Sequence, residues 1–316
     1  MMIKIKNFSK KQIILAAAAI FGLIVLGTAV LYIFYPSFKE DVNDLYYSTY
    51  NNFVIDPSLM AVADKKANLS YCGNSDRMQK MDVYTPKNLD KAAPIVMYIH
   101  GGGWIGGDKS NPFVADYGAE IVKHSMAFVS VNYRLAPQFT YPAQNDDIDC
   151  AISYLNANTK TLNIDMTRFA IMGDSAGGQL ASMAALTSPY KKQIKAVVDF
   201  YGPADVWAQV TRKPTPDKWA INYLGTANDE PLARQVSPMF ASLAAAPPFL
   251  ILHGLNDRTV YYAQSVNFEA RLKAAGVDAT LVGVKNAGHY FTAQSQPSLN
   301  DIEAQMITFL NKHLSK

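Results

Sequence analysis

The sequence predicts an α/β fold built on a mostly parallel, doubly wound sheet. Strand-like apolar runs alternate with helix-like segments along most of the chain, which is the pattern of a parallel sheet with crossover helices. Several runs, such as residues 94–100 and 248–254, are apolar without interruption, as expected for strands buried on both faces. The third observation is a strand, a tight turn and a helix around Ser175, where residues 173–177 are Gly-Asp-Ser-Ala-Gly.

Composition is compatible with a large globular domain. The chain has 316 residues, of which 49% are hydrophobic and 17% charged, so it can bury an extensive core. A net charge of +3, without a block of lysines and arginines, gives no reason to expect nucleic acid as a partner.

The N-terminus predicts a membrane anchor. Residues 13–35 carry no charge and, as a helix rising about 1.5 Å per residue, could cross a hydrocarbon layer of about 30 Å. Lysines precede this run and acidic residues follow it, which favours cytoplasmic residues 1–12 and a body outside the cytoplasm, periplasmic or extracellular. The alternative is a signal peptide cleaved after Gly27-Thr28-Ala29, but apolar residues continue beyond that site.

Residues 36–67 are interpreted as an irregular or helical connecting segment that could also cover the site, and residues 68–316 as the α/β domain. Strands are expected at residues 68–72, 79–84, 94–100, 126–133, 168–172, 195–201, 248–254 and 279–284. Helices are expected at residues 111–124, 146–156, 178–186, 261–275 and 301–314. Asp146 is expected to be an N-cap of the second helix.

The turn at Ser175 matches a nucleophile elbow, which holds a serine in a strained turn between strand and helix. Glycines on both sides are needed where a Cβ would collide with neighbouring backbone. The structural alternative is a glycine-rich turn with Ser175 as the N-cap of the following helix.

A second glycine-rich turn follows the strand at residues 94–100. Residues 100–104 are His-Gly-Gly-Gly-Trp, and such glycines let backbone N–H groups converge on one point. Together with the N–H of Ala176, those of Gly102 and Gly103 would hold an oxyanion. A flexible or anion-binding loop is the alternative, and His100 is expected to be structural.

The remaining polar candidates are Asp257 and His289. Each follows a predicted core strand, near the edge where ligands gather in open parallel sheets. The chain order Ser175, Asp257, His289 is that of a hydrolase triad on such a sheet. Separately, Asp257 could be a turn former or a helix cap, and His289 a solvated loop residue.

At this point the chain resembles the α/β-hydrolases of the hormone-sensitive-lipase-like esterase group. Residues 100–104, residues 132–137 (Asn-Tyr-Arg-Leu-Ala-Pro) and residues 173–178 carry the resemblance, which covers roughly residues 70–316. Residues 253–260 depart from that group and are more similar to the feruloyl-esterase-like and prolyl-peptidase-like branches. The resemblance implies a serine carboxylesterase with no metal or cofactor.

Residues 203–247, the cap segment, change character between two core strands, with recurring prolines and two tryptophans. This segment is expected to cover the site. Trp104, Trp207 and Trp219 are candidate substrate contacts. Bulky rings above a site favour short acyl groups of about two to six carbons, because each methylene that fits adds at most about 0.8 kcal/mol.

Cysteine and histidine do not group at metal-ligand spacing. Cys72 and Cys150 could pair outside the cytoplasm, but sequence does not place their Cα atoms within bridging distance, so they are left unpaired.

The sequence therefore predicts hydrolysis of small ester substrates by Ser175, His289 and Asp257. One alternative is the same triad acting on an amide, as an arylformamidase or peptidase. The other is a non-catalytic, membrane-tethered binding module, since a fold does not fix function.

Overall fold

The computed structural model describes residues 57–73 and 76–315. The predicted anchor at residues 13–35 and most of the predicted connecting segment lie outside them. Among the described residues, no helix is both long and apolar enough to span a membrane.

Eight strands form one sheet in the order β1-β2-β4-β3-β5-β6-β7-β8. Only the pairs β1–β2 and β2–β4 are antiparallel, and the other five are parallel. The strands are β1 (Ala63–Ser70), β2 (Lys80–Pro86), β3 (Ala93–Ile99), β4 (Ala127–Val131), β5 (Ile164–Asp174), β6 (Ile194–Phe200), β7 (Phe249–Gly254) and β8 (Ala279–Val284). The predicted mostly parallel α/β sheet is confirmed.

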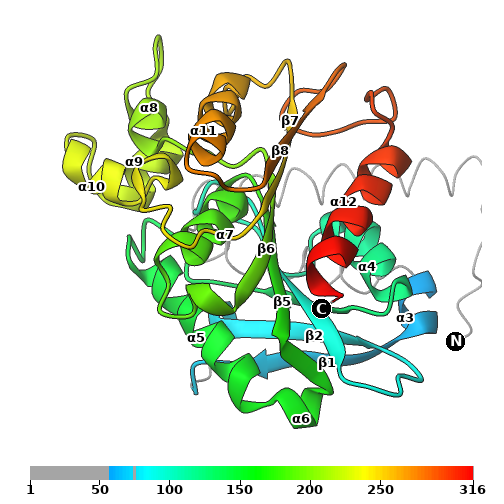
Figure 1. The fold of residues 1–316 in the computed structure, drawn as a ribbon. Helices are drawn as coiled ribbons and strands as arrows, with labels where there is room; N and C mark the ends of the chain where they lie inside the picture. Colours follow the sequence, from blue (N-terminus) through cyan, green and yellow to red (C-terminus); the bar gives the residue numbers. More distant parts are fainter. Residues whose placement is uncertain (1–56, 74–75, 316) are drawn as a thin grey trace, which may run out of the picture. The chain divides into compact units, whose positions relative to one another are not determined.

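Helices cover both faces of the sheet, as Figure 1 shows. One face packs against α3 (Pro57–Val62), α4 (Ala119–Lys123) and α12 (Leu299–Leu314). The other packs against α5 (Ala143–Ala157), α7 (Ala176–Thr187) and α11 (Tyr262–Ala274). Alternate residues of β5 enter the two cores: Phe169 and Ile171 lie on the side of α7, whereas Ala170 and Met172 lie on the side of α12. Burial on both faces explains the uninterrupted apolar runs.

The remaining helical pieces are short. They are α6 (Thr159–Leu162), a π-helix at Val114–Gly118, and 3₁₀ turns at Arg77–Gln79, Lys191–Gln193 and Pro238–Phe240. Between β6 and β7, the cap segment holds α8 (Val206–Val210), α9 (Lys218–Leu224) and α10 (Glu230–Gln235). Each of these three helices begins after an aspartate whose side chain accepts backbone N–H groups, at Asp205, Asp217 and Asp229.

Two local predictions are wrong. The first strand begins at Ala63, five residues before the expected start, because its exposed edge carries the charged Lys65 and Lys66 in place of an alternating apolar pattern. Helix α5 begins at Ala143, so Asp146 lies in its first turn and the N-cap is Pro142, without a side-chain cap bond.

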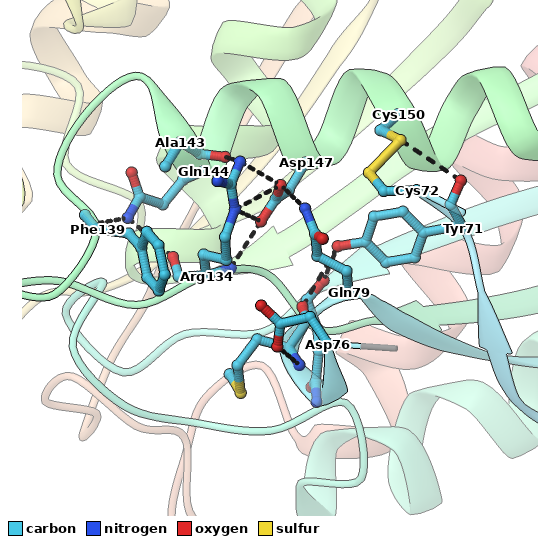
Figure 2. A network of polar contacts seen from close by, with 12 residues as sticks. Tyr71, Cys72, Asp76, Gln79, Arg134, Phe139, Ala143, Gln144, Asp147 and Cys150 are labelled. Atoms are coloured by element: carbon cyan, nitrogen blue, oxygen red, sulfur yellow. Dashed lines mark hydrogen bonds and ion pairs between the residues drawn. A yellow bond between two sulfur atoms is a disulfide. The ribbon is translucent and has the colours of Figure 1, made fainter. Parts of the chain in front are cut away.

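The unpaired assignment of the cysteines is also wrong. Cys72 and Cys150 form a disulfide, with Cα atoms 5.7 Å apart. Cys72 follows β1 and Cys150 lies on α5, and Figure 2 shows how the turn after β1 approaches that helix. Their sequence separation of 78 hides this proximity, which arises only when β2 joins the sheet beside β4.

Candidate active site

Ser175 occupies the turn between β5 and α7. Its backbone φ of 52° and ψ of −120° are rare for a residue with a side chain, and such strain is held only by surrounding structure. A Cβ on Gly173 would collide with the carbonyl of Gly177, and a Cβ on Gly177 with the carbonyl of Ile99. Although Ser175 stands at the N-cap position, its side chain makes no capping bond, so the hydroxyl is available elsewhere.

His289 is the partner of that hydroxyl. Its Nε2 lies 2.9 Å from Ser175 Oγ, and its Nδ1 lies 2.7 Å from Asp257 Oδ2. Because a carboxylate only accepts, Nδ1 carries the proton in this arrangement, and Nε2 of the neutral ring accepts from the serine hydroxyl. The His289 side chain is 10% exposed, whereas the Asp257 carboxylate is fully buried.

Asp257 is bound at both oxygens. Oδ1 accepts the backbone N–H groups of Thr259 at 2.7 Å and Val260 at 3.0 Å, while Oδ2 faces His289 and His253. Burial by itself raises the pKa of Asp257, but hydrogen bonds from the two imidazoles and the Thr259 N–H outweigh it and hold the pKa far below its ordinary value. The carboxylate is therefore ionised throughout the neutral range.

Sequence reasoning did not find His253, which is fully buried at the end of β7. Its Nε2 contacts two acceptors, Asp257 Oδ2 at 3.1 Å and the Val260 carbonyl at 2.9 Å, so this nitrogen must carry a proton. Its Nδ1 lies 2.7 Å from Ser265 Oγ on α11. The signal available in the sequence was a histidine four residues before the candidate aspartate.

The glycine turn after β3 lies beside the elbow because Ile99 of β3 pairs with Gly173 of β5. Gly102 and Gly103 have φ values of 113° and 61°, which favour glycine. Among the described residues, no hydrogen bond uses the backbone N–H of Gly102, Gly103 or Ala176. Backbone N–H groups without a partner of this kind can bind an oxyanion.

Buried side chains hold the glycine turn after β3 in place. Asp174 Oδ1 accepts the Gly101 N–H at 2.8 Å and the Tyr98 hydroxyl at 2.6 Å. His100 is fully buried, stacks on Tyr133 and bonds the Gly101 carbonyl through Nδ1 at 2.7 Å. Burial lowers the pKa of His100 and favours its neutral form, in agreement with a packing role.

The turn at residues 132–137 supports the same loop. Tyr133 donates to the His100 carbonyl at 2.9 Å, and Ala136 N–H donates to the Trp104 carbonyl at 2.8 Å. Figure 2 shows the anchor of this turn, where Arg134 pairs with the buried Asp147 of α5 at 2.7 Å. Other bonds shown there join Gln79 to Asp147 and Gln144 to the carbonyls of Arg134 and Phe139.

The three tryptophans differ in their environments. Trp104 is 2% exposed, stacks on Tyr223 and donates its indole N–H to Gln179 at 3.0 Å, so it packs the core and is not a substrate contact. Trp207 is half-buried against the core. Trp219 is 47% exposed and lies against the glycine turn after β3, since a Cβ on Gly103 would stand 3.0 Å from Trp219 Cβ.

Comparison with known proteins gives the family. The BD-FAE family profile matches residues 81–272, which is more than half of the chain. The chain belongs to the BD-FAE family. The chain is also similar to esterase LipC of Mycobacterium tuberculosis (strain ATCC 25618 / H37Rv), with 28% identity over 260 residues. The match covers 75% of this chain and 63% of LipC.

A plant relative of this BD-FAE chain is the isoprenylcysteine alpha-carbonyl methylesterase ICME of Arabidopsis thaliana. The two are 27% identical over 222 residues, covering 64% of this chain and 52% of ICME. The chain thus spans about half to just under two thirds of the length of these curated relatives.

Among solved structures, a truncated carbohydrate esterase from gut microbiota matches with a TM-score of 0.72 and 26% identity, covering 81% of this chain and 98% of that one. A bacterial heroin esterase matches with a TM-score of 0.70 and 23% identity, covering 87% and 92%, and supports the fold alone. These matches establish the α/β-hydrolase fold predicted from the sequence.

Proposed function

We propose that the chain is a serine carboxylesterase that hydrolyses small esters with short acyl groups through an acyl-enzyme. The continuous hydrogen-bonded line from Ser175 Oγ through His289 to Asp257 Oδ2, with spacings of 2.9 and 2.7 Å, carries this proposal. The names of the relatives, esterase and methylesterase, support an ester substrate.

In the first half-reaction, His289 Nε2 takes the proton of Ser175 as Oγ bonds to the ester carbonyl carbon. Asp257 holds Nδ1–H toward itself and stabilises the imidazolium that forms. The tetrahedral intermediate then collapses, the bond to the alcohol oxygen breaks, and the imidazolium returns its proton to that oxygen. The alcohol leaves, and the acyl group stays on Ser175.

In the second half-reaction, water loses a proton to His289 and attacks the acyl carbonyl. Collapse releases the carboxylic acid and restores the serine hydroxyl. In both halves the negative oxygen is expected to lie against the N–H groups of Ala176, Gly102 and Gly103. Losing one such donor typically costs about 10²–10³ in rate.

Substitution tests the assignment. Ser175→Ala should lower kcat for p-nitrophenyl acetate by about 10⁴-fold or more and abolish labelling by a fluorophosphonate, while Asp257→Asn should lose about 10⁴ through the wrong tautomer. Ser242→Ala, a change at an exposed serine of the cap segment, is the control and should retain wild-type turnover. Wild-type turnover by Ser175→Ala would refute the mechanism.

The rival amide activity has the same triad, so substitution does not distinguish it. A panel that pairs each ester with its matching anilide or formamide does. Hydrolysis of the esters at the higher kcat/KM is the expected result, and faster hydrolysis of the amides would favour an arylformamidase or peptidase.

We also propose that residues 13–35 anchor the protein in a membrane, with the α/β domain outside the cytoplasm. This proposal rests on the uncharged run and its flanking charges alone. The full chain should stay in the pellet after carbonate washing and be released by detergent. A soluble form beginning near Val30 would identify a cleaved signal peptide instead.

A further inference from the structure

A cavity of about 390 Å³ lies next to the proposed triad. It lies between the π-helix at Val114–Gly118, the end of β5, the residue after β6 and the first turns of α12. Its lining includes three acidic residues and three tyrosines: Asp116, Asp174, Glu303, Tyr117, Tyr201 and Tyr290.

The cavity adjoins the reacting groups through three of its lining residues. Asp174 directly precedes Ser175, and Tyr290 directly follows His289. The ring of Tyr201 lies 4.7 Å from that of His289, centroid to centroid, and the Tyr290 ring lies 5.2 Å from it. A group in the cavity is therefore within the reach of a small ester whose carbonyl lies at Ser175.

Aromatic rings form much of the wall. Tyr117 and Tyr201 are almost completely buried, whereas Tyr290 is 67% exposed at the mouth. Tyr290 meets Tyr201 edge to face at 6.2 Å, and Tyr201 meets Phe291 in the same way at 5.4 Å. Ring faces carry partial negative charge and attract organic cations, quaternary ammonium groups above all.

Charge points to the same chemistry. Three lining side chains are acidic, at Asp116, Asp174 and Glu303, and none of the described lining residues is lysine or arginine. Burial raises the pKa of Glu303, and the nearby carboxylates of Glu120 and Asp116 raise it further, with Lys123 opposing them. Carboxylates that already repel one another would be stabilised by a cation in the space between the rings.

A metal ion is the less suitable occupant. No group of three or more His, Cys, Asp or Glu side chains in the described part of the chain is arranged to hold one. Divalent cations need several oxygen ligands at about 2.0–2.6 Å. A diffuse organic cation instead needs aromatic rings and nearby carboxyl groups, and both line this cavity.

We propose that this cavity is the subsite for a positively charged substituent of the ester substrate, an alkylammonium group on its alcohol or acyl part. The inference rests on the proposed esterase function and names a substrate class for that site. It predicts preference for a cationic ester over an uncharged ester of the same shape.

The test compares acetylcholine with its uncharged analogue 3,3-dimethylbutyl acetate, in which carbon replaces the charged nitrogen, on the full chain at pH 8 and low salt. The cationic ester should have a kcat/KM about five- to thirty-fold higher, the range expected of a cation over aromatic faces in a partly desolvated site. Equal kcat/KM values for the two esters, or preference for the uncharged one, would overturn the proposal.

Variants locate the effect. Glu303→Gln and Asp116→Asn should each reduce the ratio toward one, because each removes a negative charge from the cavity wall with little change in side-chain shape. Glu230→Gln is the matched control, since Glu230 lies on α10 and does not line the cavity. If neither Glu303→Gln nor Asp116→Asn changes the ratio of the two kcat/KM values, the preference for the cationic ester arises elsewhere, and the subsite is refuted.

Binding separates this proposal from the esterase function. Tetramethylammonium chloride should inhibit p-nitrophenyl acetate hydrolysis competitively, relative to sodium chloride at equal ionic strength, and should bind Ser175→Ala in a calorimetric titration. Binding lost in Glu303→Gln would support the subsite even for a chain that hydrolyses no ester. Ester hydrolysis without tetramethylammonium binding would refute the subsite and leave the function intact.

Discussion

Asp257 combines two roles that the sequence suggested as alternatives. Its Oδ1 closes the turn after β7 by accepting two backbone N–H groups, which fixes the carboxylate plane. Its Oδ2 is then held toward His289. A turn former and the proposed triad acid are therefore compatible at one residue, because the turn supplies the orientation that such an acid requires.

His253 gives the first prediction at this scale. Its Nε2–H contacts the same Oδ2 that receives His289, so His253→Leu should leave that oxygen less firmly placed. We expect kcat to fall about tenfold or more, the cost of one hydrogen bond to a charged group, with KM little changed. His253→Gln, which can place an amide N–H near the same oxygen, should retain most of the activity.

Both variants need a stability measurement, because residue 253 is buried. Thermal unfolding should show that each variant is folded at the assay temperature. Equal kcat values for the Leu and Gln variants at equal stability would show that the Nε2–H donor is not used to position Asp257.

Asp199 gives the second prediction, on pH. Burial raises its pKa to about 6, although the Gly202 N–H, His253 and the Ser182 hydroxyl favour the charged form. The folded state thus binds this proton more tightly than the unfolded chain, whose value is 3.8. Below pH 3.8 the Asp199 carboxyl does not lower the free energy of unfolding. Between pH 3.8 and about 6 the loss of unfolding free energy grows, and above about 6 it is complete.

Asp199→Asn removes that penalty and keeps an oxygen for the Gly202 N–H. Relative to wild type, the variant should gain about 2–3 kcal/mol of unfolding free energy between pH 4 and pH 8. Urea unfolding at both pH values measures the difference. A stability difference between variant and wild type that does not change with pH would contradict the raised pKa.

At the scale of elements, the sequence predicted the inner strands well and the periphery poorly. The strands expected at residues 195–201 and 248–254 are observed as β6 and β7 with starts within one residue, because burial on both faces leaves a continuous apolar run. The edge strand β1 lacks that signal, since Lys65 faces Asp82 across the edge at 2.9 Å. The local hydrophobic pattern of a sequence indicates buried strands. It does not indicate an edge strand that is held by charged pairs.

The disulfide shows the same limit between elements. It joins Cys72 after β1 to Cys150 on α5, and only the register of β1, β2 and β4 brings them together. Likewise, the sequence placed Ser175, Asp257 and His289 after separate strands, whereas His253 and the packing of Trp104 depend on side-chain contacts across the sheet ends. Contacts between distant segments are not encoded in local periodicity.

Removal of this disulfide is the third prediction. Cys72→Ser with Cys150→Ser opens a link between residues 78 apart, which should lower the unfolding free energy by about 2–4 kcal/mol through the greater entropy of the unfolded chain. Thermal unfolding of the double variant, with wild type in the presence and absence of reductant, measures it. Since neither cysteine contacts the triad, kcat below the transition should stay near wild type. An unchanged midpoint would indicate that the bond contributes nothing to stability.

At the scale of the whole domain, parallel register gathers the site at one edge of the sheet. Ile99 pairs with Gly173, Asp174 with Phe200, Phe200 with Leu252, and Gly254 with Val284. The loops after β3, β5, β7 and β8 therefore leave the sheet side by side, and each carries one part of the site. This is why the order of motifs along the chain, more than any motif alone, predicted that Ser175, Asp257 and His289 would lie together.

The cap segment determines the last prediction, on substrate size. Its helices α8, α9 and α10 have 5, 7 and 6 residues, too short for an apolar lid that opens at a lipid interface. Trp219 lies against the glycine turn after β3 and limits the space above Gly103. We expect kcat/KM for p-nitrophenyl esters, measured below their micelle concentrations, to peak at acyl chains of about two to six carbons and fall steeply beyond, because the bulky Trp219 ring leaves little room for further methylenes. Trp219→Ala should move the peak to longer chains, whereas Phe240→Ala, which removes another exposed ring of the cap segment, should not.

A peak at ten or more carbons in wild type, or a rate that jumps above the micelle concentration, would instead identify a lipase.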